Sequence, residues 1–244
     1  MTSTRMVALV SGSTRGIGKV IAEQLVLDGF LVIQNSRSNV DPEEIIGEAH
    51  KIADVINYEE CKKLVTEVLR DYGKIDLLVC NVGSGKAQKM QTSSAESRDY
   101  YLRTNLHSAM NLVEIALESL IQVQGNVIAI SSICGEDPTI EAPIGYSTAK
   151  AGLNMFMKTM AARYGKQGVR FNVIAPGNVY FQGSVWDHKL TKNRLDVEAF
   201  LNQKVPLGRF IEPQEIASAV SFLAGTNSRS ITGAVLPIDG GQSL

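Results

Sequence analysis

The sequence predicts an α/β fold in which a parallel β-sheet is covered by helices on both faces. Short apolar runs alternate with longer amphipathic segments from one end of the 244-residue chain to the other. The runs are rich in valine, isoleucine and leucine without polar alternation, which is typical of strands buried on both faces. Strand–helix alternation of this kind indicates βαβ units. Because no linker, repeat or low-complexity segment divides the sequence, we expect residues 1–244 to form a single domain.

Seven segments have the strand pattern, and seven have a helical pattern. The first helix is expected to end at Asp28-Gly29, and the second to begin at Asp41-Pro42, where a cap residue precedes a proline. The expected strands are Met6–Val10, Leu31–Gln34, Ile52–Ala53, Leu77–Cys80, Val127–Ile130, Arg170–Ile174 and Val235–Ile238. The expected helices are residues 17–28, 42–49, 59–72, about 97–121, 146–164, near 193–203 and 213–224.

Composition excludes several classes of partner. Lys and Arg total 24 and Asp and Glu total 25, so the net charge of −1 gives no basic excess for nucleic acid or anionic membrane. No apolar run approaches the roughly 18 residues of a membrane span. The three cysteines have no ligand-like spacing, so we expect reduced thiols and no metal site. We therefore expect a cytoplasmic protein that binds neither nucleic acid nor membrane.

A glycine-rich turn directly follows the first expected strand and opens the first helix. Glycines at such a turn allow the backbone to approach a pyrophosphate, whose oxygens accept hydrogen bonds from the free N–H groups of the helix start. The order strand, glycine turn, helix predicts a Rossmann-type, doubly wound, seven-stranded sheet that binds a dinucleotide. The G-x-x-x-G-x-G spacing is also compatible with a turn that only reverses the chain. The expected contacts are Gly12, Ser13, Thr14, Arg15, Gly16, Ile17 and Gly18.

The end of the second strand indicates which nicotinamide cofactor is bound. An acidic residue there would bind the adenosine ribose hydroxyls of NAD. The sequence Gln34-Asn35-Ser36-Arg37-Ser38 contains no acid, whereas Arg37 and Arg15 have the charge that grips a 2′-phosphate. The sequence therefore favours NADP(H) over NAD(H).

Four residues further along the chain carry a resemblance to a known family. Tyr146 and Lys150 lie four apart on one face of an expected helix, Ser132 precedes them by 14 residues, and Asn105 lies in the long helix before that. Together with the glycine-rich turn, this set resembles the short-chain dehydrogenase/reductase family. All the landmarks occur in the family's order between Met6 and Gly241.

The resemblance implies a role for each of these side chains. Tyr146 matches the general acid/base, Lys150 the residue that lowers its pKa, and Ser132 the hydroxyl that orients the substrate carbonyl. Asn105 matches the residue that holds a water connecting Lys150 to solvent. The family is oligomeric, so a homotetramer or homodimer is implied, and Asp239-Gly240-Gly241 resembles its interface turn. The further cofactor contacts implied are Asp54, Val55, Asn81, Gly83, Tyr146, Lys150, Pro176, Gly177 and Val179.

The sequence also departs from the family. Val82 replaces the usual alanine beside the ribose, and Phe181 replaces a threonine that binds the carboxamide. Residues 180–204 form an expected substrate lid that is longer than in compact members. Tyr180, Phe181 and Trp186 have the character of an apolar pocket; His188, Lys189 and Lys192 suit either an anion or a solvated helix surface.

The substrate is the least determined feature. Val123 and Gln167 stand where 3-oxoacyl-acyl-carrier-protein reductases place arginines that dock the carrier protein, although Lys166 and Arg170 lie nearby. We therefore favour hydride transfer between nicotinamide and the carbonyl or secondary alcohol of a small substrate, with the carrier-protein reductase of fatty-acid synthesis second. A non-catalytic NADP-binding regulator is the alternative from another class, and such a protein would usually have lost Tyr146 or Lys150.

Overall fold

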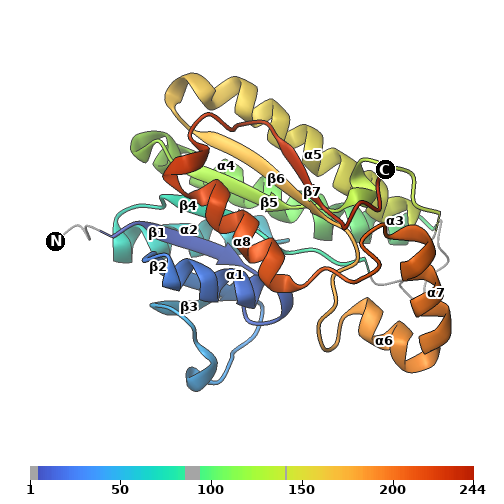
Figure 1. Cartoon of the computed structure of the whole chain (residues 1–244). Coiled ribbons are helices and arrows are strands. Elements are labelled where there is room, and N and C mark those ends of the chain that lie inside the picture. The colour runs from blue at the N-terminus through green and yellow to red at the C-terminus, as the bar shows by residue number, and fades with distance from the viewer. Residues whose placement is uncertain (1–4, 86–93, 141) are drawn as a thin grey trace.

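A computed structural model describes residues 5–85, 94–140 and 142–244. Its centre is one sheet of seven parallel strands in the order β3-β2-β1-β4-β5-β6-β7, which confirms the predicted doubly wound fold (Figure 1). The strands are β1 (Val7–Ser11), β2 (Leu31–Ser36), β3 (Ala49–Ile52), β4 (Leu77–Cys80), β5 (Asn126–Ile130), β6 (Arg170–Pro176) and β7 (Val235–Ile238).

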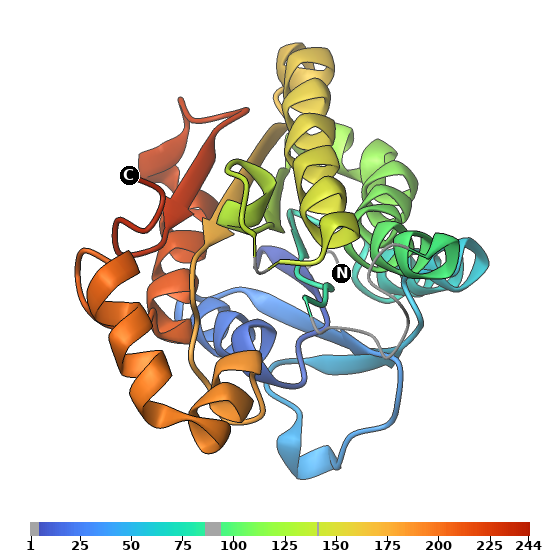
Figure 2. The same ribbon diagram turned by 90° about the vertical axis from the view of Figure 1, so that its right-hand side faces the viewer.

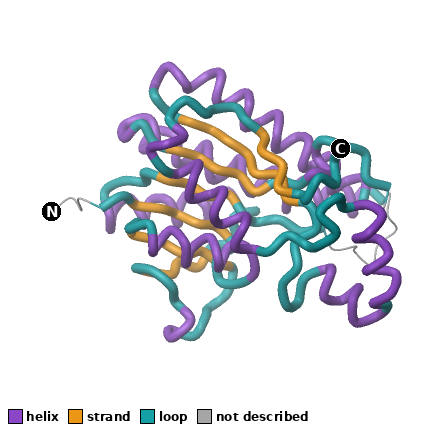
Figure 3. Tube along the Cα trace, viewed as in Figure 1, coloured by secondary structure: helices purple, strands orange, loops and turns teal. Residues whose placement is uncertain are grey.

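Helices flank the sheet in two layers (Figure 3). Helices α1 and α8 cover one face, and α2, α4 and α5 cover the other. None of the described helices combines the length and apolar composition needed to cross a membrane. The helices are α1 (Gly16–Leu27), α2 (Tyr58–Tyr72), α3 (Ala95–Leu102), α4 (Ser108–Val123), α5 (Ile144–Tyr164), α6 (Val185–Lys192), α7 (Arg194–Lys204) and α8 (Pro213–Ala224).

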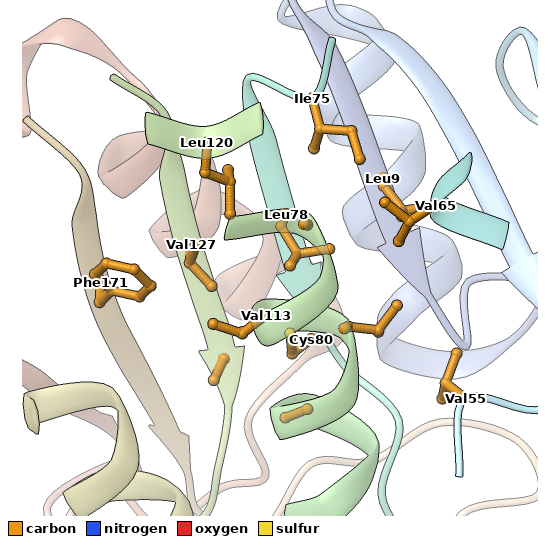
Figure 4. Close-up of a cluster of buried hydrophobic side chains, with 14 of the residues drawn as sticks. Leu9, Val55, Val65, Ile75, Leu78, Cys80, Val113, Leu120, Val127 and Phe171 are labelled. Carbon is orange, nitrogen blue, oxygen red and sulfur yellow. The ribbon is translucent and has the colours of Figure 1, made fainter. Parts of the chain in front are cut away.

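Two separate cores explain why the strands are apolar without alternation. Successive strand residues point to opposite faces, so Leu9 packs under α2 and α4 while Val10 packs under α1 and α8. Leu78 and Val79 of β4 divide in the same way. Figure 4 shows the first core, in which the fully buried Phe171 lies at one end of the cluster. Burial on both faces therefore requires an apolar residue at nearly every strand position.

The predicted helix over residues 42–49 is wrong. Asp41 caps a single 3-10 turn at Pro42–Glu44, its carboxylate accepting from the Glu43 backbone N–H at 3.1 Å. The chain then becomes extended, and the Glu48 N–H donates to the Val32 carbonyl of β2 at 2.9 Å. The third strand consequently begins at Ala49 rather than at the predicted Ile52. Residues 37–48 are only long enough to cross back to the sheet edge, so no helix covers β2 and β3 there.

The predicted helix over residues 97–121 and the predicted lid also differ in detail. The first is divided into α3 and α4 by one π-helical turn, Arg103–His107. The lid contains two helices, of which α7 was predicted near residues 193–203 and α6 was not predicted. The Ser184 hydroxyl accepts from the Asp187 N–H at 3.1 Å. A serine followed three residues later by an acid is an N-terminal helix signal, so α6 was detectable in the sequence.

The carboxyl ends of the strands define where a ligand binds. From β1 the chain order runs outward to β2 and β3 on one side and to β4 through β7 on the other. The connections after β1 and β4 therefore leave in opposite directions, and doubly wound folds bind ligands at such a point. Figure 2 looks at this end of the sheet, where α6 and α7 project beyond the strands.

Candidate active site

The glycine-rich turn lies between β1 and α1 and has no space for side chains. Gly12 and Gly16 adopt φ of +61° and +56°, which favour glycine. A Cβ on Gly18 would lie 2.3 Å from the Gly12 carbonyl oxygen and 2.4 Å from Asn81 Nδ2. The turn is thus packed against its own backbone and against the loop after β4.

Buried polar side chains hold the turn to the end of β2. Ser13 N–H donates to the Asn35 carbonyl at 3.0 Å, and Asn35 N–H donates to Ser13 Oγ at 3.0 Å. The Gln34 amide is fully buried; its Nε2 donates to the Ser13 carbonyl at 2.7 Å and its Oε1 accepts from Ile46 N–H at 2.6 Å. The sequence analysis missed this role, because a glutamine within an apolar run carries no signal of its partners.

The start of α1 is suited to an anion. Arg15 occupies the N-cap position without a side-chain capping hydrogen bond, and the first turn contains no acidic residue. Among the described residues no side-chain acceptor competes for the N–H groups there, and the helix dipole adds positive potential. Arg15 and Arg37 are both exposed, and each follows by two residues one of the hydrogen-bonded residues Ser13 and Asn35.

The loop after β3 contains the predicted adenine contacts. Asp54 Oδ1 accepts from Ile56 N–H at 3.1 Å, and the Asp54 N–H donates to Glu60 at 2.7 Å. The Val55 side chain is buried, and its carbonyl accepts from Asn111 Nδ2 at 3.1 Å. Asn111 on α4 therefore fixes this loop, a contact across 56 residues that the sequence analysis did not find.

Asn81 ties the loop after β4 to the glycine-rich turn. Its Nδ2 donates to the carbonyls of Ser11 and Gly12 at 3.1 and 3.0 Å. Val82, the larger residue predicted to alter the fit, contacts the same turn, with its Cγ2 3.0 Å from a Cβ built on Gly12. Asn81 thus holds the loop after β4 against the backbone of the glycine-rich turn.

Tyr146 and Lys150 occupy the first two turns of α5, beside Ser132. The Lys150 ammonium lies 5.8 Å from the centre of the Tyr146 ring and donates to the Ile130 carbonyl at 2.8 Å. Ser132 follows β5 and accepts from the Cys134 N–H at 3.2 Å, and its hydroxyl acts on Tyr146 by lowering the pKa of the phenol. The structure therefore brings together the three residues that the sequence placed 14 and 18 positions apart.

Burial sets the protonation states of this group. It raises the pKa of Tyr146 to about 12, which the hydrogen bond from Ser132 partly opposes. Burial lowers the pKa of Lys150, only 2% exposed, to about 8. At neutral pH the phenol therefore holds its proton, while the ammonium is close enough to its pKa to exchange one.

Asn105 lies in the π-helical turn between α3 and α4. Its Oδ1 accepts from the Ser84 N–H at 2.8 Å, and its Nδ2 donates to the carbonyls of Ser84 and Tyr101 at 3.2 and 3.1 Å. Extra backbone turns of this type recur at functional sites. The side chain thereby holds the loop after β4. The sequence analysis did not predict the π turn.

The side chains of Asn105 and Lys150 both approach Gly83 closely. A Cβ on Gly83 would lie 2.8 Å from Asn105 Oδ1 and 3.1 Å from Lys150 Nζ. Tyr101 packs against the far side of the group, with its ring 6.4 Å from that of Tyr146 in an edge arrangement. All four predicted catalytic residues therefore lie around the carboxyl ends of β4 and β5.

The predicted carboxamide contacts follow β6. Gly177 N–H donates to the Ile238 carbonyl at 3.0 Å, and a Cβ there would lie 2.8 Å from the Asp239 Cα. Val179 pairs with Ile211 in an isolated bridge. Pro176 is the last residue of β6, so these residues lie between the carboxyl end of that strand and the lid in the chain.

The aromatic residues of the lid do not line one pocket. Trp186 packs 5.2 Å from Phe200 within the lid's own apolar cluster, and the exposed Tyr180 stacks 5.6 Å from Phe210, a member of that cluster. The Lys189 ammonium lies 4.2 Å above the Trp186 ring. Phe181 alone turns toward the sheet, where two of its ring carbons lie 2.8 and 2.9 Å from a Cβ built on Gly16.

Comparison with known proteins agrees with this arrangement. The profile of the family described as Enoyl-(Acyl carrier protein) reductase matches residues 12–243. The chain is 34% identical to the 3-oxoacyl-acyl-carrier-protein reductase FabG of Haemophilus influenzae, and the match covers 98% of both chains. It is 31% identical to glucose 1-dehydrogenase 2 of Bacillus subtilis, covering 99% of this chain and 96% of the relative.

A solved structure has the same fold over the whole chain. The structure described as the Pseudomonas aeruginosa RhlG/NADP active-site complex superposes with a TM-score of 0.87 at 27% identity, covering 100% of this chain and 98% of that chain. The chain belongs to the short-chain dehydrogenase/reductase family. As a member of this family of oxidoreductases, it shares its relatives' fold from end to end, while the relatives' substrates differ from one another.

Replacing Gly18 by alanine tests whether the turn is a close-approach site. The new Cβ would meet the Gly12 carbonyl at 2.3 Å, so the turn must shift. We expect NADPH affinity to fall at least about tenfold and stability to fall by about 1–3 kcal/mol. Titration of NADPH fluorescence and thermal unfolding measure these effects. Gly165→Ala is the matched control, because nothing lies within 4 Å of its Cβ; unchanged NADPH affinity in Gly18→Ala would contradict the assignment.

Proposed function

We propose that this chain is an NADP(H)-dependent oxidoreductase that transfers a hydride between nicotinamide and the carbonyl or secondary alcohol of a small substrate. The observation that carries the proposal is the convergence of Tyr146, Lys150 and Ser132 at the carboxyl end of β5. A regulator without activity has no need of a buried lysine next to a half-buried tyrosine, because burying such a polar group is unfavourable.

Tyr146 is the proton donor in the direction of reduction. Burial keeps its phenol protonated at neutral pH, so a proton is available for the oxygen on which charge develops. Ser132, hydrogen-bonded to Tyr146, is placed to donate to the same oxygen. When bound, the nicotinamide supplies or accepts the hydride and is positively charged in its oxidised form.

Lys150 makes the reverse proton transfer accessible. In this proposal its ammonium, 5.8 Å from the centre of the Tyr146 ring, favours the phenolate that forms when Tyr146 gives up its proton. The Ile130 carbonyl fixes the amine at 2.8 Å. Because the pKa of Lys150 is about 8, the amine is able to pass a proton to Tyr146 and regain one near neutral pH. In this proposal Asn105, whose Oδ1 approaches the same side of Gly83 as the Lys150 Nζ, would hold a water that connects Lys150 to solvent.

The described residues fit a dinucleotide phosphate. Gly18 has no room for a Cβ beside the Gly12 carbonyl and Asn81, as expected of the glycine that allows helix and strand to pack closely in a dinucleotide-binding turn. The start of α1 supplies N–H groups, and the exposed Arg15 and Arg37 supply positive charge suited to a 2′-phosphate. These features, together with the RhlG/NADP neighbour, support NADP(H) over NAD(H).

Residues 180–204 act as the substrate lid in this proposal, within one domain of residues 1–244. Phe181 anchors the lid on Gly16, so its ring occupies space that a cofactor at the glycine-rich turn must share. We propose that cofactor binding moves this ring and thereby repositions α6 and α7. Exposed Leu207 and Leu244 near the C-terminus support assembly into a homodimer or homotetramer.

A small substrate is favoured over a carrier-bound one by the position of Arg170. Its guanidinium donates to the Leu223, Ser228 and Ile231 carbonyls at 2.7, 3.2 and 3.1 Å, so it is committed within the fold. Of the basic residues near the predicted docking positions, Lys166 is exposed. The identity to FabG keeps carrier-protein reduction as the second candidate.

The role of Tyr146 is tested by Tyr146→Phe. Removing the phenolic proton should lower turnover by about 10²- to 10⁴-fold while NADPH affinity changes little, because the ring still packs against Tyr101. Steady-state rates and NADPH titration separate the two effects. Tyr164→Phe, at the other end of α5, is the control and should retain full activity. Undiminished turnover in Tyr146→Phe would refute the mechanism.

Cofactor selectivity is tested with Arg37→Ala. Wild type should bind NADPH more tightly than NADH, and the substitution should weaken NADPH about tenfold or more while leaving NADH unchanged, since it removes a charge-assisted bond to phosphate. Calorimetric titration gives both dissociation constants. Arg163→Ala, near the end of α5, removes a positive charge away from the site as a control. Equal wild-type affinities for the two cofactors would overturn the assignment.

The substrate class is tested by following NADPH absorbance with a cyclic ketone, a sugar nucleotide and a short 3-oxoacyl thioester. The thioester is offered both on pantetheine and on acyl-carrier protein. Because Arg170 is committed internally, the carrier should give no advantage in KM. A KM about tenfold lower on the carrier protein, with no activity on the other substrates, would instead establish the carrier-protein reductase.

A further inference from the structure

The hydroxyl of Ser36, at the end of β2, is engaged on two sides. Its Oγ donates to the Ser38 carbonyl at 2.7 Å and lies 2.8 Å from His50 Nε2 on β3. The two strands are in register here, with Gln34 opposite His50 and Ser36 opposite Ile52. The first bond spans Arg37, and the second ties that short turn to the neighbouring strand.

The chemistry of a hydroxyl fixes the direction of both bonds. Ser36 has one proton, and the Ser38 carbonyl can only accept, so the proton points there. At the second contact Ser36 Oγ must therefore accept, and His50 must carry its proton on Nε2. The Ser36 proton is thus committed to holding the backbone around Arg37 and is not available to a ligand.

Arg37 is held in place through the backbone of the turn around it. Its side chain is exposed, and it forms no ion pair within the parts of the chain that the structure describes. The connection over residues 37–48 contains one 3-10 turn and no α-helix, so no helix buttresses the residues after β2. The contact from His50 consequently replaces support that a helical crossover would give.

We propose that Ser36 and His50 are positioning residues that set selectivity for the ribose 2′-phosphate by holding the turn that presents Arg37. The inference rests on the proposed use of NADP(H). Neither side chain touches the phosphate. Their effect is to restrict the conformations of Arg37, so that less entropy is lost when its guanidinium binds a phosphate. The effect is therefore specific to a cofactor that carries the 2′-phosphate.

His50→Leu and Ser36→Ala remove the contact from either side. We expect each to raise the dissociation constant of NADPH about five- to tenfold, the usual effect of one hydrogen bond, with that of NADH unchanged. His50→Gln and Ser36→Thr keep a donor and a hydroxyl, respectively, and should restore most of the selectivity. Calorimetric titration with both cofactors is combined with thermal unfolding of every variant.

The outcomes separate this inference from the cofactor assignment. If wild type does not prefer NADPH, the proposed cofactor is wrong and this inference falls with it. If wild type prefers NADPH and Arg37→Ala loses that preference while His50→Leu and Ser36→Ala keep it, only this inference is overturned. Equal weakening of NADPH and NADH in these two variants also overturns it, because that result marks a purely structural role.

Discussion

The glycine-rich turn and the Asn81 side chain approach so closely that nothing larger than hydrogen fits at Gly18. This contact joins the carboxyl ends of β1 and β4, the two neighbouring strands from which the chain departs in opposite directions. Helix α1 begins at this junction, and its N-cap residue Arg15 makes no side-chain capping hydrogen bond. The remaining parts of the site lie around the junction: Arg37 after β2, Tyr146 and Lys150 on α5, and the lid after β6.

Buried polar groups make this arrangement unique. Gln34 fixes the turn, and Asn105 and Lys150 meet at Gly83, each with its hydrogen-bonding groups directed to backbone partners. Groups of this kind destabilise a fold unless they are paired, so they tolerate few alternative conformations. The same burial moves the pKa of Lys150 down and that of Tyr146 up. Burial of these groups therefore both restricts the conformation of the site and shifts the pKa values of Tyr146 and Lys150.

Three further features lie outside the candidate catalytic group. The crossover between β2 and β3 contains one 3-10 turn and no α-helix, Phe181 packs on Gly16, and Arg170, at the amino end of β6, donates to three carbonyls inside the fold. Relatives that differ in substrate, such as FabG and glucose 1-dehydrogenase 2, share the same frame. Specificity in this fold accordingly depends on loops that the frame holds in place.

The sequence by itself predicted the strand–helix alternation, the glycine-rich turn and the candidate catalytic set, because each has a local signature: apolar runs, glycine spacing, or Tyr146 and Lys150 four apart on one helix. The sequence wrongly predicted a helix at residues 42–49 and gave no sign of the π turn at Asn105. Both features depend on the contacts that the segment makes with other parts of the fold. Only the tertiary structure decided that Trp186 packs within the lid, that Phe181 faces Gly16, and that His50 supports Ser36. Those contacts join residues far apart in the chain, and their energies depend on burial and direction, which a linear pattern does not contain.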